Sequence, residues 1–302
     1  MTSAPAFGAS VWVQHPDGRI QAISPSDGLH YQASISPDGT DIVWYGGASG
    51  KPRIWRMTLP DGRAHPITPE TTGARHPAFS PDGRRIAFAS DRMSDVPGES
   101  VSEISSATIK TSAAMKLHLF TSRPDGTDVR QLTHGPHQDH RPTWSPDGEW
   151  ITFASNRSGE TAIWRVASNG SGEPEPIFTA HWGYRPWFTL DGTSVLFYGP
   201  DGDRHRIWRV EIGSGTASPI ASDDRGITHG PFVQPGSDDR MMAHSTRDGS
   251  WGIWEYPLSG SGEPSLLTPP GFSQAAHATR SRDGTLVFDV KAEWITPASS
   301  EP

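Results

Sequence analysis

The chain of 302 residues contains no cysteine, which excludes disulfide bonds, thiolate zinc sites and cysteine nucleophiles. It also lacks an apolar run long enough to cross a membrane as a helix, and its first residues lack the basic and apolar regions of a signal peptide. The net charge of −8 argues against nucleic acid as the main partner. We therefore expect a cytoplasmic protein that binds neither a membrane nor nucleic acid.

Hydrophobic residues are also scarce, at 33% of the chain, whereas Gly and Pro are frequent, with 32 and 28 copies. Turn formers at this frequency exclude long helices. The 12 Trp residues argue against disorder, because disordered chains are poor in aromatic residues. The composition favours an all-β protein of many short strands joined by tight turns. Histidine stands out, with 13 copies.

A strand–turn–strand motif recurs along the chain. Its turn reads Ser-Pro-Asp-Gly or a close variant, and an apolar strand follows the turn. The six copies cover residues 34–44, 79–90, 144–155, 188–197, 233–243 and 281–288. In such turns Asp hydrogen-bonds its own downstream backbone and Gly adopts positive φ. We therefore interpret the turn Asp residues as structural.

A second motif alternates with the first: an Ile-Trp strand or a close variant, a Gly turn and a further short strand. Five copies follow the first motif, and the sixth stands at the start of the chain, at residues 11–23. This permuted order predicts a six-bladed β-propeller of four-stranded antiparallel blades, because a closed ring covers every blade face and protects the strand edges. Residues 10–24 would form the outer strands of the last blade and residues 276–290 its inner strands, within one domain spanning 1–302.

One repeat is longer than the others. The turn residues Asp82 and Asp147 stand farther apart than the other successive turn Asp residues, and the excess falls in the Ser/Thr-rich stretch 92–116. Loops of this length are commonly either functional or without fixed structure. Both interpretations stay open: a lid over the channel mouth, or a surface loop.

The motif set resembles the TolB-type propeller repeat, which combines Ser-Pro-Asp-Gly, an apolar strand, Ser-Asx-Arg and Ile-Trp. The Ser-Asx-Arg part, or a variant of it, occurs at Asp91-Arg92, Asn156-Arg157 and Thr246-Arg247. The resemblance covers nearly the whole chain and implies a TolB-like propeller. It leaves the function open, because this scaffold hosts lyases, peptidase gating domains and adaptors.

Histidines gather at one end of the expected inner strands. Counting back from each turn Asp places a His at or near the start of all six inner strands: His30, His76, His140, His181, His229 and His277. A single His there is ordinarily a hydrogen-bonded strand residue, but convergence from six blades indicates a binding site at the channel mouth. The longest loops also lie on this face, and binding and catalytic residues are often found on loops.

Arginines join these histidines, and guanidinium groups bind carboxylate or phosphate in a bidentate fashion. We therefore expect a small anionic ligand or an acidic oligosaccharide as partner. The candidate substrate-binding residues are Arg75, Arg141, Arg92, Arg157, Arg247, Tyr184, His181 and His30. Imidazole also suits a divalent metal such as manganese, zinc or calcium. With a carboxylate neutralised, a base such as His140 or His76 could drive β-elimination.

The start of the last inner strand carries a second resemblance. Gln274-Ala-Ala-His277 is similar to the Gln-x-x-His-x-His metal motif of oligogalacturonate lyases, cytoplasmic propellers that use a divalent metal. The resemblance implies metal binding by His229, Gln274 and His277 and aligns the family's catalytic base position with Arg185. Thr279 departs from the motif, because the family has its third His there.

Whether the protein is an enzyme stays open at this point. The alternative is a non-catalytic scaffold that binds a peptide or protein in the same mouth, as TolB-like propellers can. The sequence has no Gly-x-Ser-x-Gly elbow of a serine hydrolase. A glycosidase would need two carboxylates in the site, and the candidates are Asp139, Asp203 and Asp289.

Overall fold

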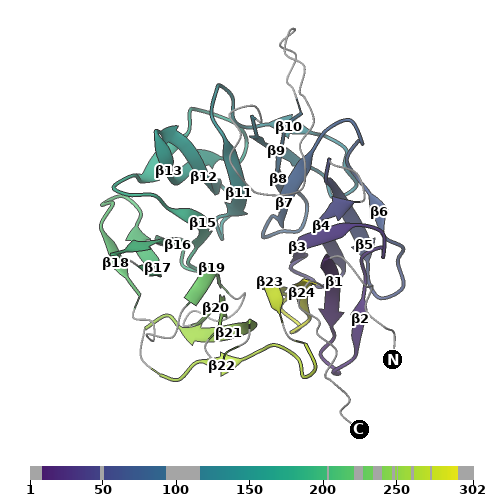
Figure 1. The fold of residues 1–302 in the computed structure, drawn as a ribbon. Coiled ribbons are helices and arrows are strands. Elements are labelled where there is room, and N and C mark those ends of the chain that lie inside the picture. The colour runs from purple at the N-terminus through teal and green to yellow at the C-terminus, as the bar shows by residue number, and fades with distance from the viewer. Residues whose placement is uncertain are drawn as a thin grey trace.

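The computed structural model describes residues 9–47, 51–92, 116–202, 204–220, 227–233, 240–246, 249, 251–259, 262–272 and 274–291. All secondary structure in these ranges is β-strand, arranged as six blades around a central channel (Figure 1). None of the described segments forms a helix with the length and hydrophobicity that membrane crossing requires. The expected all-β six-bladed propeller is confirmed.

Five blades follow the order of the chain from the channel outward. The first contains β3 (Leu29–Ile35), β4 (Asp41–Gly47), β5 (Arg53–Thr58) and β6 (His65–Pro66). The second contains β7 (Ala74–Phe79), β8 (Ile86–Ser90), β9 (His118–Ser122) and β10 (Arg130–Gln131). The third contains β11 (Asp139–Trp144), β12 (Trp150–Ser158), β13 (Glu160–Ala167) and β14 (Glu175–Phe178).

The fourth blade contains β15 (Tyr184–Phe188), β16 (Ser194–Asp201), β17 (Arg204–Glu211) and β18 (Ala217–Pro219). The fifth contains β19 (Ile227–Val233), β20 (Arg240–Ser245), β21 (Gly252–Pro257) and β22 (Ser265–Leu266). The innermost strands β3, β7, β11, β15, β19 and β23 surround the channel (Figure 1). These six strands position the candidate site.

The sixth blade closes the ring with both ends of the described chain. Its inner strands are β23 (Ala275–Arg280) and β24 (Leu286–Lys291), and its outer strands are β1 (Ala9–Gln14) and β2 (Ile20–Ala22). Strand β1 pairs antiparallel with β24 from Ala9↔Lys291 to Gln14↔Leu286. The predicted closure of the ring by the N-terminal strands is therefore confirmed.

The recurring tight turns join the two inner strands of each blade. In the first copy, the Ser36 hydroxyl donates to the Asp38 carboxylate at 2.6 Å, and the Asp38 carboxylate accepts the Thr40 N–H at 3.1 Å. Gly39 donates its N–H to the Ser36 carbonyl and has a φ of 76°, a conformation in which glycine has no Cβ penalty. These bonds lower the pKa of Asp38, and they give the turn Asp the structural role expected from the sequence.

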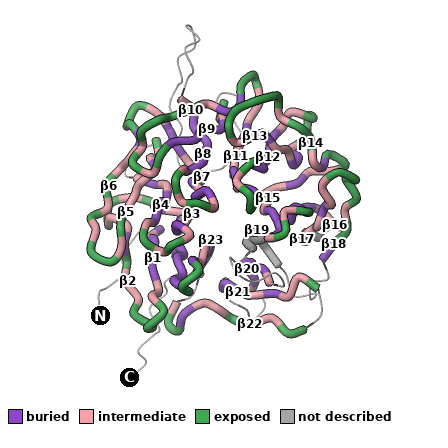
Figure 2. The backbone as a smooth tube through the Cα atoms, turned by 180° about the vertical axis from the view of Figure 1, so that it is seen from behind, coloured by how far each residue is buried: buried purple, intermediate pink, exposed green. Residues whose placement is uncertain are grey.

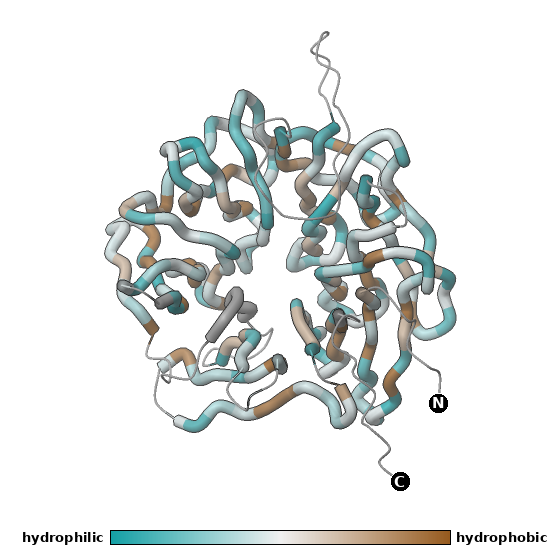
Figure 3. The backbone as a smooth tube through the Cα atoms, in the orientation of Figure 1, coloured by the Kyte–Doolittle hydropathy of each residue, from teal (hydrophilic) through white to brown (hydrophobic). Residues whose placement is uncertain are grey.

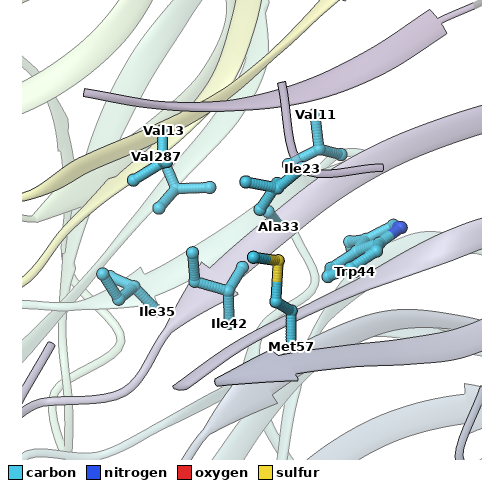
Figure 4. Packing of buried hydrophobic residues seen from close by; sticks show 9 residues of the cluster. All are labelled: Val11, Val13, Ile23, Ala33, Ile35, Ile42, Trp44, Met57 and Val287. Carbon is cyan, nitrogen blue, oxygen red and sulfur yellow. The ribbon is translucent and has the colours of Figure 1, made fainter. Parts of the chain in front are cut away.

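Hydrophobic residues fill the spaces between neighbouring blades. Figure 4 shows Val11, Val13 and Val287 of the sixth blade against Ile42 and Trp44 of the first. Buried residues dominate the strands, while the connecting turns on the rim are exposed and hydrophilic (Figures 2 and 3). Apolar burial of this kind is the main favourable contribution to folding, and it holds each inner strand at the channel.

The Ser-Asx-Arg motif ties the second strand of a blade to the entry of its inner strand. The Asp91 carboxylate accepts the N–H of Gly73 at 2.6 Å, and the Asn156 side-chain carbonyl accepts the N–H of Gln138 at 2.8 Å. Both donors lie directly before an inner strand. The motif therefore sets where two inner strands begin.

Residues 93–115, the bulk of the predicted insertion 92–116, lie outside the described residues. Its two interpretations, lid or surface loop, stay predictions.

Candidate functional site

A β-bulge interrupts each inner strand close to the channel. In the third blade the register between β11 and β12 shifts between His140 and Thr143, and equivalent shifts occur in the other five blades. Five of these bulges carry a non-glycine residue with positive φ, and we call these residues the bulge ring: Gln32, His76, Arg141, Arg185 and His277. Positive φ is unusual for residues with a Cβ and is typical of strained functional sites.

The fifth blade differs at this point. Its register shifts twice, between Ile227 and His229 and between His229 and Phe232, and the second shift spans Gly230 and Pro231. The side chains of β19 are outside the described part of the structure. The sequence places a glycine at the bulge of this blade, where the ring elsewhere has a polar side chain.

The bulge ring lines a central cavity of about 70 Å³. The remaining lining comes from the residues that follow each ring member, including Ser34, Ala78, Thr143, Trp187 and Thr279. A single water needs roughly 15 Å³ of such volume. The cavity therefore has room for a few waters or for the charged head group of a small ligand.

Aromatic rings form an arc beside the cavity, across the first four blades. The ring centroids of Tyr31 and Tyr45 are 5.9 Å apart, those of Tyr45 and His76 5.3 Å, those of His76 and His140 6.5 Å, and those of His140 and Tyr184 5.2 Å. Three of these four pairs are edge-to-face, which is a favoured geometry for aromatic pairs. The arc fixes the two imidazoles next to the arginines.

Burial among arginines keeps the two imidazoles neutral. Burial, followed by the charge of Arg141, lowers the pKa of His140 to about 4 and that of His76 well below its ordinary 6.5. Burial and the charge of Arg141 also lower the pKa of Arg185, to about 9. At neutral pH the site therefore combines charged guanidiniums with uncharged imidazoles.

The guanidinium of Arg141 lies 4.8 Å from the ring centroid of Tyr184, within cation–π range. Burial raises the pKa of the Tyr184 hydroxyl, but the charge and hydrogen bond of Arg141 outweigh burial and lower it. Burial raises the pKa of Tyr45 in spite of the nearby arginines. A protonated phenol can donate a hydrogen bond, and the raised pKa of Tyr45 favours that form.

Several buried nitrogens of this site have no hydrogen-bond partner within the described part of the chain. They are Nε of Arg75, Nε of Arg141, Nε and Nη1 of Arg185, Nδ1 of His76 and Nε2 of His140. A neutral polar group that is buried without a hydrogen-bond partner costs about 1–3 kcal/mol, and a buried charged donor without a partner costs several kcal/mol. The guanidinium nitrogens among them only donate, and they are therefore suited to an anion.

His277 bridges two opposite charges. Its Nδ1 donates to the Asp289 carboxylate at 2.9 and 3.1 Å, and its Nε2 accepts a hydrogen bond from Nη2 of Arg185 at 2.8 Å. The main-chain N–H of His277 donates to Nε2 of His244, which is buried. Asp289 has no exposed surface and also accepts the main-chain N–H of Gln32 at 3.1 Å.

This arrangement does not fit the predicted metal at His277, because both ring nitrogens are engaged and a guanidinium faces Nε2. Gln274 has a buried side-chain oxygen without a partner in the described structure, but the side chain of His229 is not described. Among the described residues there is no group of three or more His, Asp or Glu side chains that could hold a metal. Metal binding by His229, Gln274 and His277 stays a prediction.

Two predicted histidines pack elsewhere. Nδ1 of His30 accepts a hydrogen bond from the Trp44 indole at 3.0 Å, and the His30 ring lies edge-on to Trp55. The His181 ring packs against Phe178 and Trp208. Neither His lines the cavity, and both contact Trp side chains of their blades. Arg75, His140 and Tyr184 are not in the lining either, but each directly precedes a lining residue in the chain.

The two described arginines of the Ser-Asx-Arg motif, Arg92 and Arg157, also lie apart from the cavity lining. Nη2 of Arg157 donates to the fully buried Asp139 carboxylate at 2.6 Å. Arg92 lines a different pocket of about 250 Å³, together with Thr68 and Phe88. Arg247 lies outside the described residues.

Sequence reasoning missed Tyr45 and His244 as site residues. Both lie on the second strand of their blade, where they pair with the residue just before the bulge, as Tyr31↔Tyr45 and His229↔His244. Asp289 makes the equivalent pair with Ala276 in the sixth blade. The second and third blades have Ala at this position, so a comparison of the six repeats would have revealed the polar exceptions.

The family model for the TolB beta propeller domain matches residues 103–278. A protein of unassigned function from Agrobacterium fabrum is 30% identical over 225 residues, covering 65% of this chain and 67% of that protein. Further relatives include a peptidase of Bacillus subtilis, a TolB homologue of Chlorobium luteolum and a tricorn protease homologue of Streptomyces coelicolor. The chain spans 23%, 36% and 10% of their respective lengths.

Solved structures share the fold at low sequence identity. A structure assigned to TolB from Agrobacterium tumefaciens has a TM-score of 0.71 at 16% identity and covers 94% of this chain and 98% of that chain. An oligogalacturonate lyase in complex with manganese has a TM-score of 0.53 at 15% identity and covers 90% and 69%. These likenesses establish the propeller architecture, which hosts several functions.

Proposed function

The chain belongs to the TolB beta propeller domain family, and from this premise we propose that it binds the anionic group of a small ligand in its central channel. One observation carries the proposal: Arg141 and Arg185 both line the cavity, and Nε of each and Nη1 of Arg185 are buried without a partner in the described structure. Arginine forks match carboxylate and phosphate geometry. The protein as a whole carries a net negative charge. An anion would therefore be attracted to the arginines of the channel more than to the rest of the surface.

The cavity volume narrows the ligand. About 70 Å³ accommodates a carboxylate or phosphate group with a few further atoms, whereas drug-sized ligands occupy pockets of about 300–1,000 Å³. An acidic oligosaccharide would therefore place one charged group in the cavity, and the rest of the chain would extend toward the mouth.

A lyase reaction on an oligouronide is the catalytic form of this proposal. Arg141 and Arg185 would hold the carboxylate and acidify the neighbouring carbon, and the neutral imidazole of His140 or His76 would accept the proton. The electron pair left on that carbon would form a C=C bond as the bond to the glycosidic oxygen breaks, and the departing sugar oxygen would take a proton from water. The low pKa of His140, about 4, keeps it in the unprotonated form that a base requires. A bound divalent metal would supply further carboxylate polarisation, but the described residues at His277 do not fit one.

A peptide is the second candidate, favoured by relatives named as a peptidase, a TolB homologue and a tricorn protease homologue. A peptide would present its C-terminal carboxylate to the same arginines. The two candidates share the anionic group and differ in the rest of the ligand.

Isothermal titration calorimetry at low salt tests the proposal. The probes are trigalacturonate, a tripeptide with a free C-terminus, the same tripeptide as its amide, and inorganic phosphate. We expect a free carboxylate to bind and the amide not to bind. Arg141→Ala should weaken binding by about tenfold or more, since hydrogen bonds to charged groups contribute about 1.5–3 kcal/mol.

Arg84→Ala is the matched control, because Arg84 is exposed in a turn of the second blade. Equal affinity for the acid and the amide, or no effect of Arg141→Ala, would contradict anion binding in the channel. The preferred probe then separates sugar from peptide. Absorbance of an unsaturated product with trigalacturonate tests the lyase reaction.

A further inference from the structure

A chain of hydrogen bonds crosses the channel from the sixth blade to the fourth. It runs from the Asp289 carboxylate through the His277 imidazole to the Arg185 guanidinium, with distances of 2.9 Å and 2.8 Å. His277 and Arg185 are 92 positions apart in the sequence and both belong to the bulge ring. Their contact therefore depends on the curvature of the whole ring.

The chemistry of the carboxylate determines the tautomer of His277. An ionised carboxylate only accepts hydrogen bonds, so Nδ1 of His277 must carry a proton. In the neutral imidazole Nε2 then has a free lone pair, and a guanidinium, which only donates, can bind there. With the opposite tautomer, the N–H groups of His277 and Arg185 would oppose each other.

The remaining donors of the Arg185 guanidinium indicate what its hydrogen bond to His277 does. Nη2 of Arg185 is engaged by His277, while Nε and Nη1 are buried and have no partner in the described part of the structure. One end of the guanidinium is thus anchored, and the other end is left for a ligand. A planar fork that is held in place loses little entropy when it binds a carboxylate.

We propose that Asp289 is a positioning residue that, through the tautomer of His277, holds the Arg185 guanidinium in place for the anion in the channel. This inference rests on the proposed function for its ligand, but its structural part does not. Asp289 itself is remote from the ligand: it has no exposed surface, and its carboxylate is occupied by His277 and by the N–H of Gln32.

NMR of 15N-histidine-labelled protein tests the structural part without any ligand. Long-range 1H–15N correlations should show His277 as the tautomer protonated at Nδ1. Asp289→Asn should convert His277 at least partly to the Nε2-protonated tautomer, because the new amide can donate to Nδ1. Asp41→Asn, which removes the partner of Arg56 at 2.8 Å, is the control and should leave the tautomer unchanged.

Affinity for the carboxylate probe that binds the wild-type protein tests the functional part. Asp289→Asn should weaken binding by about tenfold, and it should have less than about a twofold effect in an Arg185→Ala background, because the two residues act as a unit. His277→Gln keeps one donor and one acceptor. It should therefore bind more tightly than His277→Leu.

Two results would overturn the inference: an Nε2-protonated His277 in the wild-type protein, or equal losses from Asp289→Asn in both backgrounds. The second result would mean that Asp289 acts through folding in general. Failure of the proposed function has a different signature. In that case no anion would bind the wild-type protein, while the tautomer of His277 would still respond to Asp289→Asn.

Discussion

At the scale of single residues, the channel places charged guanidinium groups next to uncharged imidazoles. The rings of His76 and His140 lie 6.5 Å apart, next to Arg141. Burial disfavours the imidazolium, and a neighbouring guanidinium disfavours it further. The histidines therefore act as neutral donors and acceptors, and the arginines supply the positive charge.

His140 should make stability depend on pH. Its pKa is about 4 in the folded protein, against 6.5 for the ordinary side chain. Between these pH values the unfolded chain binds more protons than the folded protein. The contribution of His140 to the free energy of unfolding is therefore fully present above about pH 6.5 and is lost as the pH falls toward 4. The loss attributable to His140 is on the order of 3 kcal/mol.

Urea denaturation of the wild-type protein and of His140→Gln, between pH 4.5 and 8, measures this effect. We expect the Gln variant to have a flatter pH profile. His65→Gln, at an exposed position on β6, should keep the wild-type slope. An unchanged slope in His140→Gln would contradict the burial of a neutral imidazole.

At the scale of elements, the bulge of the inner strand is the device that forms the site. It gives Arg141 a φ of 57° and Arg185 a φ of 55°. Left-handed backbone costs roughly 1–2 kcal/mol for a residue with a Cβ. Five blades retain this strained conformation with non-glycine side chains, which indicates a functional use of those side chains.

Glycine and alanine substitutions at Arg141 test the bulge. Both remove the guanidinium, but glycine tolerates positive φ, so Arg141→Gly should be more stable than Arg141→Ala by about 1 kcal/mol. Urea denaturation gives the difference. At Arg165, within β13, the order should reverse, because glycine weakens an ordinary strand by about 0.5–1 kcal/mol. A more stable Ala variant at Arg141 would contradict the strained bulge.

At the scale of the whole molecule, the ring depends on a blade built from both ends of the described chain. Strand β1 supplies Val11 and Val13 to the cluster that also contains Val287, Ile42 and Trp44 (Figure 4). The N-terminal strand of the closing blade therefore contributes to the core between the sixth and first blades. The same closure brings His277 and Asp289 opposite Arg185.

Val11→Ala and Val166→Ala compare the closing blade with an internal blade. Both valines are fully buried, and each substitution removes two methyl groups, at a cost of about 2 kcal/mol. We expect equal losses and a single unfolding transition in urea. A separate early transition in Val11→Ala, or a negligible loss, would show that the closing blade is weaker than the others.

Much of the fold was predictable because its signals are local and repeat six times. The turn at Ser36–Gly39 and the Ile54-Trp55 strand need only their own neighbours in the chain. The register of the inner strands followed from the turns, and it placed His76, Arg141, Arg185 and His277 at the channel. The bulges themselves were not predicted, because nothing in a single repeat distinguishes a regular strand from a bulged one.

By itself, the sequence determined the six blades, the permuted closure and the end of the inner strands where polar groups gather. Only the tertiary structure decided which of those groups reach the cavity. His30 and His181 pack on tryptophans instead, and Asp289 and Arg185 meet through His277. The physical reason is distance along the chain: turns and strand patterns depend on adjacent residues, whereas contacts between blades depend on how six repeats curve around one axis.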